Sequence, residues 1–227
     1  MLEDEAKLLS SWMATLQPGE ISPLVNLGSS SRDYRTNRQP HIERELFAPL
    51  RAVGVEVINV DIKEVEGVDI AGDIFDPVTQ EKIRERKPGA IMCCNMLEHV
   101  ADRDSLAKVI NELMADGAFL FVTVPLSYPY HPDPIDTGFR PSPSELSKLF
   151  PGLHAVRSQI ICGCTFLTAT FREREPAWAV AHLGLDMMKA LLLWRKGPDK
   201  WKAYLHRYFW FFRPYKVSAV MMRKPSG

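Results

Sequence analysis

Cysteine is scarce in this sequence, and its arrangement does not suggest a covalent framework. The four cysteines stand as the adjacent pair Cys93 and Cys94 and as the spaced pair Cys162 and Cys164. Adjacent residues of a strand point to opposite faces, so the first pair is poorly placed to form a disulfide. The second pair lacks the two-residue gap and the partner ligands of a zinc knuckle. We therefore expect buried thiols in a reducing, cytoplasmic environment.

Long apolar runs and a net charge are lacking as well. No run of about eighteen apolar residues occurs, so no segment is expected to span a bilayer. The first residues, MLEDEAKLLSSWM, are acidic and amphipathic, unlike the basic and then apolar order of a signal peptide. Lysine and arginine together number 28, as do aspartate and glutamate, so the chain has no overall attraction for nucleic acid.

The composition that remains is that of an ordinary globular domain. Of the 227 residues, 46% are hydrophobic and 25% are charged. A chain of this length buries roughly 70–75% of the surface that its unfolded form exposes. It therefore needs neither disulfides nor a structural metal to hold a core, and a disordered or collagen-like chain is excluded.

Stretches rich in β-formers alternate with helical stretches along the chain. We expect helices over residues 1–17, 41–53, 78–87, 101–114 and 143–150, and strands over 23–28, 55–60, 68–74, 90–94, 118–124, 158–171 and 217–222. This alternation predicts a parallel sheet with crossover helices on both faces, and the last two strands can pair as an antiparallel hairpin. The sequence thus predicts a single α/β domain, residues 1–227, with a seven-stranded, mostly parallel Rossmann-like sheet and a helical insertion at 172–216.

Polar residues stand at the carboxyl ends of the first four predicted strands, where ligands bind in an open parallel sheet. They are Gly28, Ser29 and Ser30 after the first strand, Asp61 after the second, Asp73 and Ile74 at the third, and Asn95 after the fourth. Asp61 suits the two hydroxyls of a ribose, while Asp73 and Ile74 suit the amino group and the face of an adenine. Each signal is weak alone, since a turn, a strand end or a helix cap also explains it. Together they favour one adenosine-shaped site.

Five segments resemble, in order, the motifs of class I S-adenosylmethionine-dependent methyltransferases, type 11 most closely. They are LVNLGSSS, INVDI, AGDIFDP, AIMCCNMLEHV and MADGAFLFVTVP, within about residues 20–171. The resemblance implies S-adenosylmethionine as cofactor and a reversed last strand, which VSAVMMRK would form. It implies that the Gly28–Ser29–Ser30 loop faces the methionine portion, Asp61 the ribose, Asp73 and Ile74 the adenine, and Asn95 the sulfonium.

The first loop departs from the family pattern. Asn26 stands where the family has an acidic residue, and serines replace later glycines of the loop. Asp61 follows Gly28 by 33 positions, against about 20 in a compact nucleotide-binding unit. A non-catalytic binding or scaffold protein on the same fold is therefore the alternative. A pyridine-nucleotide dehydrogenase would require G-x-G-x-x-G, and the chain has GSSSRD.

The predicted reaction is methyl transfer to a small molecule or a glycan, including a lipid-linked one, with oxygen the favoured atom. An oxygen acceptor must lose its proton, and the candidate bases are His99 and His131. His131 lies in a proline-rich loop that resembles the acceptor-facing stretch of type 11 relatives, with Asp133, Asp136 and Arg140 as its other polar members. His99 could equally hold the strand–helix corner, and Asp136 could simply pair with Arg140. No metal site is expected, because the other histidines show no ligand spacing.

Residues 176–216 combine basic and aromatic side chains. This segment holds eight lysines and arginines against two aspartates, and ten of the 22 aromatic residues. Helices at 176–196 and 198–212 would each carry an apolar stripe. The stripes can pack on the domain or on a second subunit, cover the acceptor pocket as a lid, or lie on a membrane surface.

Overall fold

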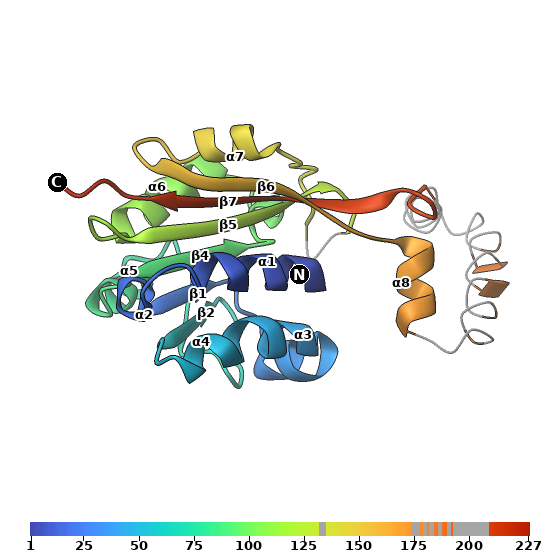
Figure 1. Cartoon of the computed structure of the whole chain (residues 1–227), viewed down its shortest axis with the longest axis horizontal. Coiled ribbons are helices and arrows are strands. Elements are labelled where there is room, and N and C mark those ends of the chain that lie inside the picture. Colours follow the sequence, from blue (N-terminus) through green and yellow to red (C-terminus); the bar gives the residue numbers. More distant parts are fainter. Residues whose placement is uncertain are drawn as a thin grey trace.

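The computed structural model describes residues 1–131, 135–173, 178, 181, 184–185, 188–189, 192 and 209–227. In this part of the chain a seven-stranded sheet has the order β3-β2-β1-β4-β5-β7-β6 (Figure 1). The strands are β1 (Leu24–Leu27), β2 (Val57–Asp61), β3 (Ile70–Ala71), β4 (Ala90–Cys94), β5 (Phe119–Ser127), β6 (His154–Thr165) and β7 (Pro214–Arg223). The first five strands are parallel, and β7 runs antiparallel between β5 and β6. The predicted fold class and terminal hairpin are confirmed.

Helices cover both faces of the sheet. They are α1 (Glu3–Met13), α2 (Pro18–Ile21), α3 (Pro40–Ile42), α4 (Ala48–Ala52), α5 (Pro77–Glu85), α6 (Arg103–Leu113), α7 (Pro143–Lys148) and α8 (Phe166–Glu173), with the short π-helices η1 (Tyr34–Arg38) and η2 (Glu43–Phe47) and the 3-10 helix η3 (Leu97–His99). Because side chains alternate along each strand, the sheet supplies one apolar surface to each of two cores. One core packs α5, α6 and α7 against the sheet, and the other packs α1 and the helical stretch from α3 to α4.

Two predicted strands were too long, since β3 covers only Ile70–Ala71 of the stretch expected at 68–74. Residues 158–171 were expected to form a single strand, but β6 ends at Thr165 and α8 begins at Phe166. The Thr165 hydroxyl accepts a hydrogen bond from the Thr168 amide, at 3.2 Å, and the Thr168 hydroxyl donates back to the Thr165 carbonyl. This local capping satisfies backbone groups at the first turn of a helix, so β-favouring residues such as Phe166 and Phe171 become helical.

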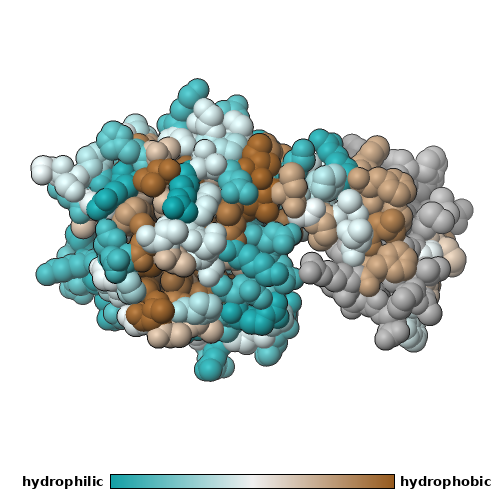
Figure 2. All heavy atoms as spheres, in the orientation of Figure 1, coloured by the Kyte–Doolittle hydropathy of each residue, from teal (hydrophilic) through white to brown (hydrophobic). Residues whose placement is uncertain are grey.

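Most of the predicted insertion at 172–216 lies outside the described residues, so the helix at 176–196 and most of the helix at 198–212 stay predictions. The end of the insertion was placed too late, because β7 begins at Pro214, and residues 209–212, expected to end the second helix, are not helical. Of its described side chains, Trp178, Leu185, Met188 and Leu192 are all more than half exposed. Trp210, by contrast, is buried. Figure 2 shows apolar residues on the surface of this part of the molecule. None of the described helices combines the length and the apolar composition that crossing a bilayer requires.

Candidate functional site

A cavity of about 1090 Å³ lies at the carboxyl edge of the parallel strands. All nine residues predicted for the cofactor and for catalysis line it: Gly28, Ser29, Ser30, Asp61, Asp73, Ile74, Asn95, His99 and His131. The parallel register brings them together, because β1, β2 and β4 end at the same edge of the sheet. This volume slightly exceeds the usual range of ligand sites, about 300–1,000 Å³, and suffices for a nucleoside together with a second small molecule.

The first loop is held by a buried arginine rather than by glycines. Gly28 and Ser30 both have positive φ, +69° and +55°, so the chain turns sharply after β1. The Arg35 guanidinium donates to the carbonyl oxygens of Ser29, Ser30 and Gly67 at 2.8, 2.6 and 2.7 Å. Burial lowers the pKa of Arg35. The sequence did not indicate this role, since an arginine in a long polar loop carries no signal of burial.

Two carboxylates border the loop. The Ser30 amide donates to the Asp61 carboxylate at 2.7 Å, and the Lys63 amide donates to its other oxygen at 3.0 Å. These bonds fix Asp61 at the end of β2 while leaving carboxylate lone pairs for a diol. Asp73 accepts from the Phe75 amide, whereas the cap of α5 is Asp76. The helix-cap interpretation of Asp73 is therefore wrong.

Asn95, at the end of β4, is tied to the N-terminal helix. Its φ is +50°, and its side-chain amide donates to the Glu5 carboxylate at 2.7 Å. Glu5 is fully buried and also accepts from the Thr123 hydroxyl and the Leu2 amide. These hydrogen bonds hold helix α1 beside the cavity. Leu2 and Glu5 are among the residues that line it. Nothing in the sequence indicated this, because a glutamate in a first helical turn is ordinary.

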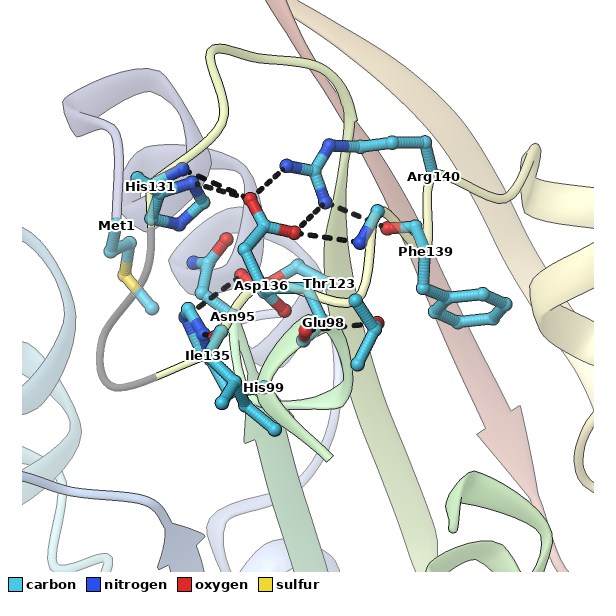
Figure 3. Close-up of polar contacts among 12 residues, drawn as sticks. Met1, Asn95, Glu98, His99, Thr123, His131, Ile135, Asp136, Phe139 and Arg140 are labelled. Carbon is cyan, nitrogen blue, oxygen red and sulfur yellow. Dashed lines mark hydrogen bonds and ion pairs between the residues drawn. The ribbon is translucent and has the colours of Figure 1, made fainter. Parts of the chain in front are cut away.

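Two histidines and a buried glutamate meet on one wall of the cavity (Figure 3). The rings of His99 and His131 meet edge to face with centroids 5.2 Å apart. Nδ1 of His99 hydrogen-bonds with the Ile135 carbonyl, and Nδ1 of His131 with the Pro129 carbonyl at 3.0 Å. Burial lowers the pKa of His131, which favours the neutral ring.

Glu98 lies next to His99 and is fully buried. Neither of its carboxylate oxygens accepts a hydrogen bond from any described residue. The Nε2 atom of the His99 ring lies 3.7 Å from Glu98 Oε1. Burial raises the pKa of Glu98 to about 7. Glu98 was not among the site residues predicted from the sequence.

Asp136 and Arg140 lie next to His131 (Figure 3), and neither is among the residues that line the cavity. Both guanidinium Nη atoms of Arg140 donate to Asp136, at 3.1 and 2.6 Å. Asp136 also accepts from the amides of His131 and Gly138. Burial opposes its ionisation, but these donors outweigh burial and lower the pKa of Asp136 to about 2. The predicted Asp136–Arg140 pairing is confirmed, while Asp133 lies outside the described residues.

The model of a family described as a methyltransferase domain matches residues 43–188. No curated protein is similar enough in sequence to count as a match. Among solved structures, coclaurine N-methyltransferase bound to N-methylheliamine and S-adenosylhomocysteine is 15% identical, with a TM-score of 0.51 over 97% of this chain and 72% of that one. A SAM-dependent methyltransferase from Archaeoglobus fulgidus is 13% identical, with a TM-score of 0.50 over 96% and 94%. At these identities, the likeness shows a shared fold.

Proposed function

The chain belongs to the methyltransferase domain family, and from that premise we propose that it transfers the methyl group of S-adenosylmethionine to an oxygen of a small molecule or glycan. One observation carries the proposal. A single cavity is lined by the loops that follow β1, β2 and β4, the last of which carries His99, and by His131 from the loop after β5. Such a cavity has room for a nucleoside donor and an acceptor in mutual contact.

The donor side of the cavity supports S-adenosylmethionine. Asp61 is positioned to accept from the ribose hydroxyls, and Asp73 with Ile74 to contact the adenine. In this proposal the loop of Gly28, Ser29 and Ser30 faces the methionine portion of the cofactor, and the Asn95 side chain lies beside the sulfonium. The scaffold alternative rests on the missing glycines, and the hydrogen bonds from Arg35 explain how this loop keeps its shape without them.

The acceptor side supports a ring-bearing hydroxyl compound. Tyr128 and Tyr215 line the cavity with ring centroids 4.7 Å apart, and Tyr128 meets the His131 ring at 5.0 Å. Flat aromatic walls of this kind stack against a sugar or another ring. The carbon–sulfur bond breaks as the methyl–oxygen bond forms, and the acceptor's proton passes to His131. A positioned base contributes roughly 10²–10⁴-fold, and orientation of the two substrates contributes more.

We propose two further properties. The enzyme acts in the cytoplasm, as its free cysteines suggest. Residues 176–216 form the contact with a partner surface, either a membrane or a second subunit. The exposed apolar side chains of Trp178, Leu185, Met188 and Leu192 support a contact there, and most of the segment's basic residues lie outside the described residues.

Calorimetric titration with S-adenosylhomocysteine tests the proposed donor. The wild-type chain should bind it, and Asp61→Ala should abolish binding, because the ribose hydroxyls lose their acceptor. Asp104→Ala is the matched control, since Asp104 is exposed on α6 and does not line the cavity. Absence of binding to the wild type at millimolar ligand favours the scaffold alternative, and unchanged affinity in Asp61→Ala contradicts the role of Asp61.

A further inference from the structure

We propose that Glu98, His99 and His131 bind a divalent transition-metal ion at the acceptor side of the cavity. One potential ligand atom from each residue lies within 4.8 Å of the other two. Metal–ligand bonds of 2.0–2.2 Å place neighbouring ligands about 3 Å apart. A contraction of about 1–2 Å by side-chain rotation therefore brings the three atoms around one ion.

Glu98 is the observation that points to a ligand. Its carboxylate is fully buried, yet no described residue donates a hydrogen bond to either oxygen. Burying an ionised carboxylate is costly unless it is paired, hydrogen-bonded or bound to a metal. His99 Nε2, which is itself a potential ligand atom, lies 3.7 Å from Glu98 Oε1. A cation between them would supply the partner that Glu98 lacks.

The two histidines are oriented as metal ligands are. Ligating imidazoles usually direct one ring nitrogen to a carbonyl or carboxylate and leave the other for the metal. Nδ1 of His99 is directed to the Ile135 carbonyl. Nδ1 of His131 is directed to the Pro129 carbonyl and lies 3.3 Å from Asp136 Oδ2. Both rings therefore keep Nε2 as the available lone pair, and one loop supplies the supporting groups.

The chemical nature of the three ligand groups indicates which metal ions the site would bind. Two imidazoles with one carboxylate suit Zn²⁺, Fe²⁺ or Co²⁺ better than Mg²⁺ or Ca²⁺, which prefer oxygen ligands alone. Three protein ligands leave coordination positions open, as in catalytic rather than structural sites. The open positions face the cavity that all three residues line.

The metal site would add a step to the proposed function. Binding of the ion does not depend on that function, but its role in activating the acceptor does. An acceptor hydroxyl bound to the ion has a lowered pKa and loses its proton to solvent. Its oxygen then forms the bond to the methyl carbon as the carbon–sulfur bond breaks, which releases neutral S-adenosylhomocysteine. With the ion bound, His131 is a ligand, and the ion replaces it in activating the hydroxyl.

Cobalt(II) titration of the metal-free full-length chain tests the site, with visible absorption as the readout and Zn²⁺ as competitor. We expect one Co²⁺ per chain and displacement by Zn²⁺. Glu98→Gln and His99→Asn should each weaken binding at least tenfold, whereas His154→Asn, which removes an exposed histidine on β6, should leave it unchanged. Absence of a cobalt spectrum in the wild type, or equal affinity in Glu98→Gln, overturns the inference.

Binding of S-adenosylhomocysteine separates this inference from the proposed function. Glu98→Gln should still bind S-adenosylhomocysteine, which also shows that the variant is folded. If the wild type binds S-adenosylhomocysteine but no Co²⁺, the metal site is wrong and the methyltransferase proposal stands. If it binds Co²⁺ but no S-adenosylhomocysteine, the metal site stands and the proposed donor is wrong.

Discussion

Two buried charged residues, Arg35 and Glu5, hold the segments that line the cavity in place. Arg35 and Glu5 each make three hydrogen bonds to segments that line the cavity, and neither belongs to a sequence motif. A buried charge is tolerated only when such partners are present. Loss of either side chain therefore leaves several buried polar groups without a partner.

Arg35→Met should lower the free energy of unfolding by about 2–3 kcal/mol, because three carbonyl oxygens lose a charged donor. It should also weaken S-adenosylhomocysteine binding at least tenfold, since the loop after β1 loses its support. Denaturant unfolding and calorimetry measure the two effects. Arg32→Met is the control: its exposed ion pair with Glu66 should contribute less than about 1 kcal/mol. Equal behaviour of the two variants would contradict the role of Arg35.

Asp136 should make stability depend on pH. Its pKa is lowered from 3.8 to about 2 in the folded state, so its contribution is complete above about pH 5 and is lost as the pH falls through about 2. The shift corresponds to about 2 kcal/mol for this fully buried side chain. Asp136→Asn should therefore lose about 2 kcal/mol at pH 7 and distinctly less at pH 3, by urea unfolding of the metal-free protein. A difference that does not vary with pH would argue against the ion pair with Arg140.

At the scale of elements, the strand ends fix where the chemistry lies. Parallel pairing of β1 with β2 and β4 brings three loops to one edge, and the start of β4 sets that register. Gly89 precedes β4, where the chain passes close to the segment between α2 and β1. A Cβ at Gly89 would lie 2.7 Å from the Glu20 carbonyl oxygen and 3.0 Å from that of Ser22.

Gly89→Ala should destabilise the protein by about 2 kcal/mol or more, since the atoms that its methyl group meets are backbone atoms that cannot rotate away. Gly19→Ala is the matched control in α2, where an added Cβ meets nothing within 4 Å. That change should be neutral or stabilising by up to about 1 kcal/mol. Thermal unfolding of both variants gives the comparison, and a harmless Gly89→Ala would show that the backbone there can shift.

At the scale of the whole molecule, the sheet domain and segment 176–216 differ in the surface that they offer. The described side chains of that segment include Trp178 and Leu192, which are 72% and 67% exposed. Apolar groups of this size are rarely left to water in contiguous patches. The segment holds eight basic and two acidic residues, which suits contact with an anionic membrane, whereas the apolar side chains alone would suit contact with a second subunit.

Co-sedimentation with vesicles distinguishes these surfaces. If the segment contacts membrane, the protein should pellet with anionic vesicles and less with neutral ones, and the double variant Trp178→Ala with Leu192→Ala should pellet less. Val156→Ala, at an exposed apolar residue on β6, is the control. Trp210 is unsuited to the test because it is buried. Light scattering of the same samples detects a dimer, and a monomer that binds no vesicle contradicts both forms of the proposal.

Local patterns in the sequence determined the order of the elements and the strand ends at which the site lies. Nearly continuous apolar runs in AIMCC and AFLFVTVP marked strands that are buried on both faces, and glycine and proline marked their ends. Parallel strands between crossover helices then had to end at one edge, so Gly28, Asp61 and Asn95 could be assigned to one cavity.

Only the tertiary structure decided which polar groups meet inside that cavity. Glu5 reaches Asn95 across 90 positions, Arg35 reaches Gly67 across 32, and the buried Glu98 faces a histidine from a later loop. Such pairs leave no periodic trace, because each is selected by desolvation and by donor geometry between distant segments. The sequence alone thus determined where the site lies, and only the tertiary structure determined which polar groups meet in it.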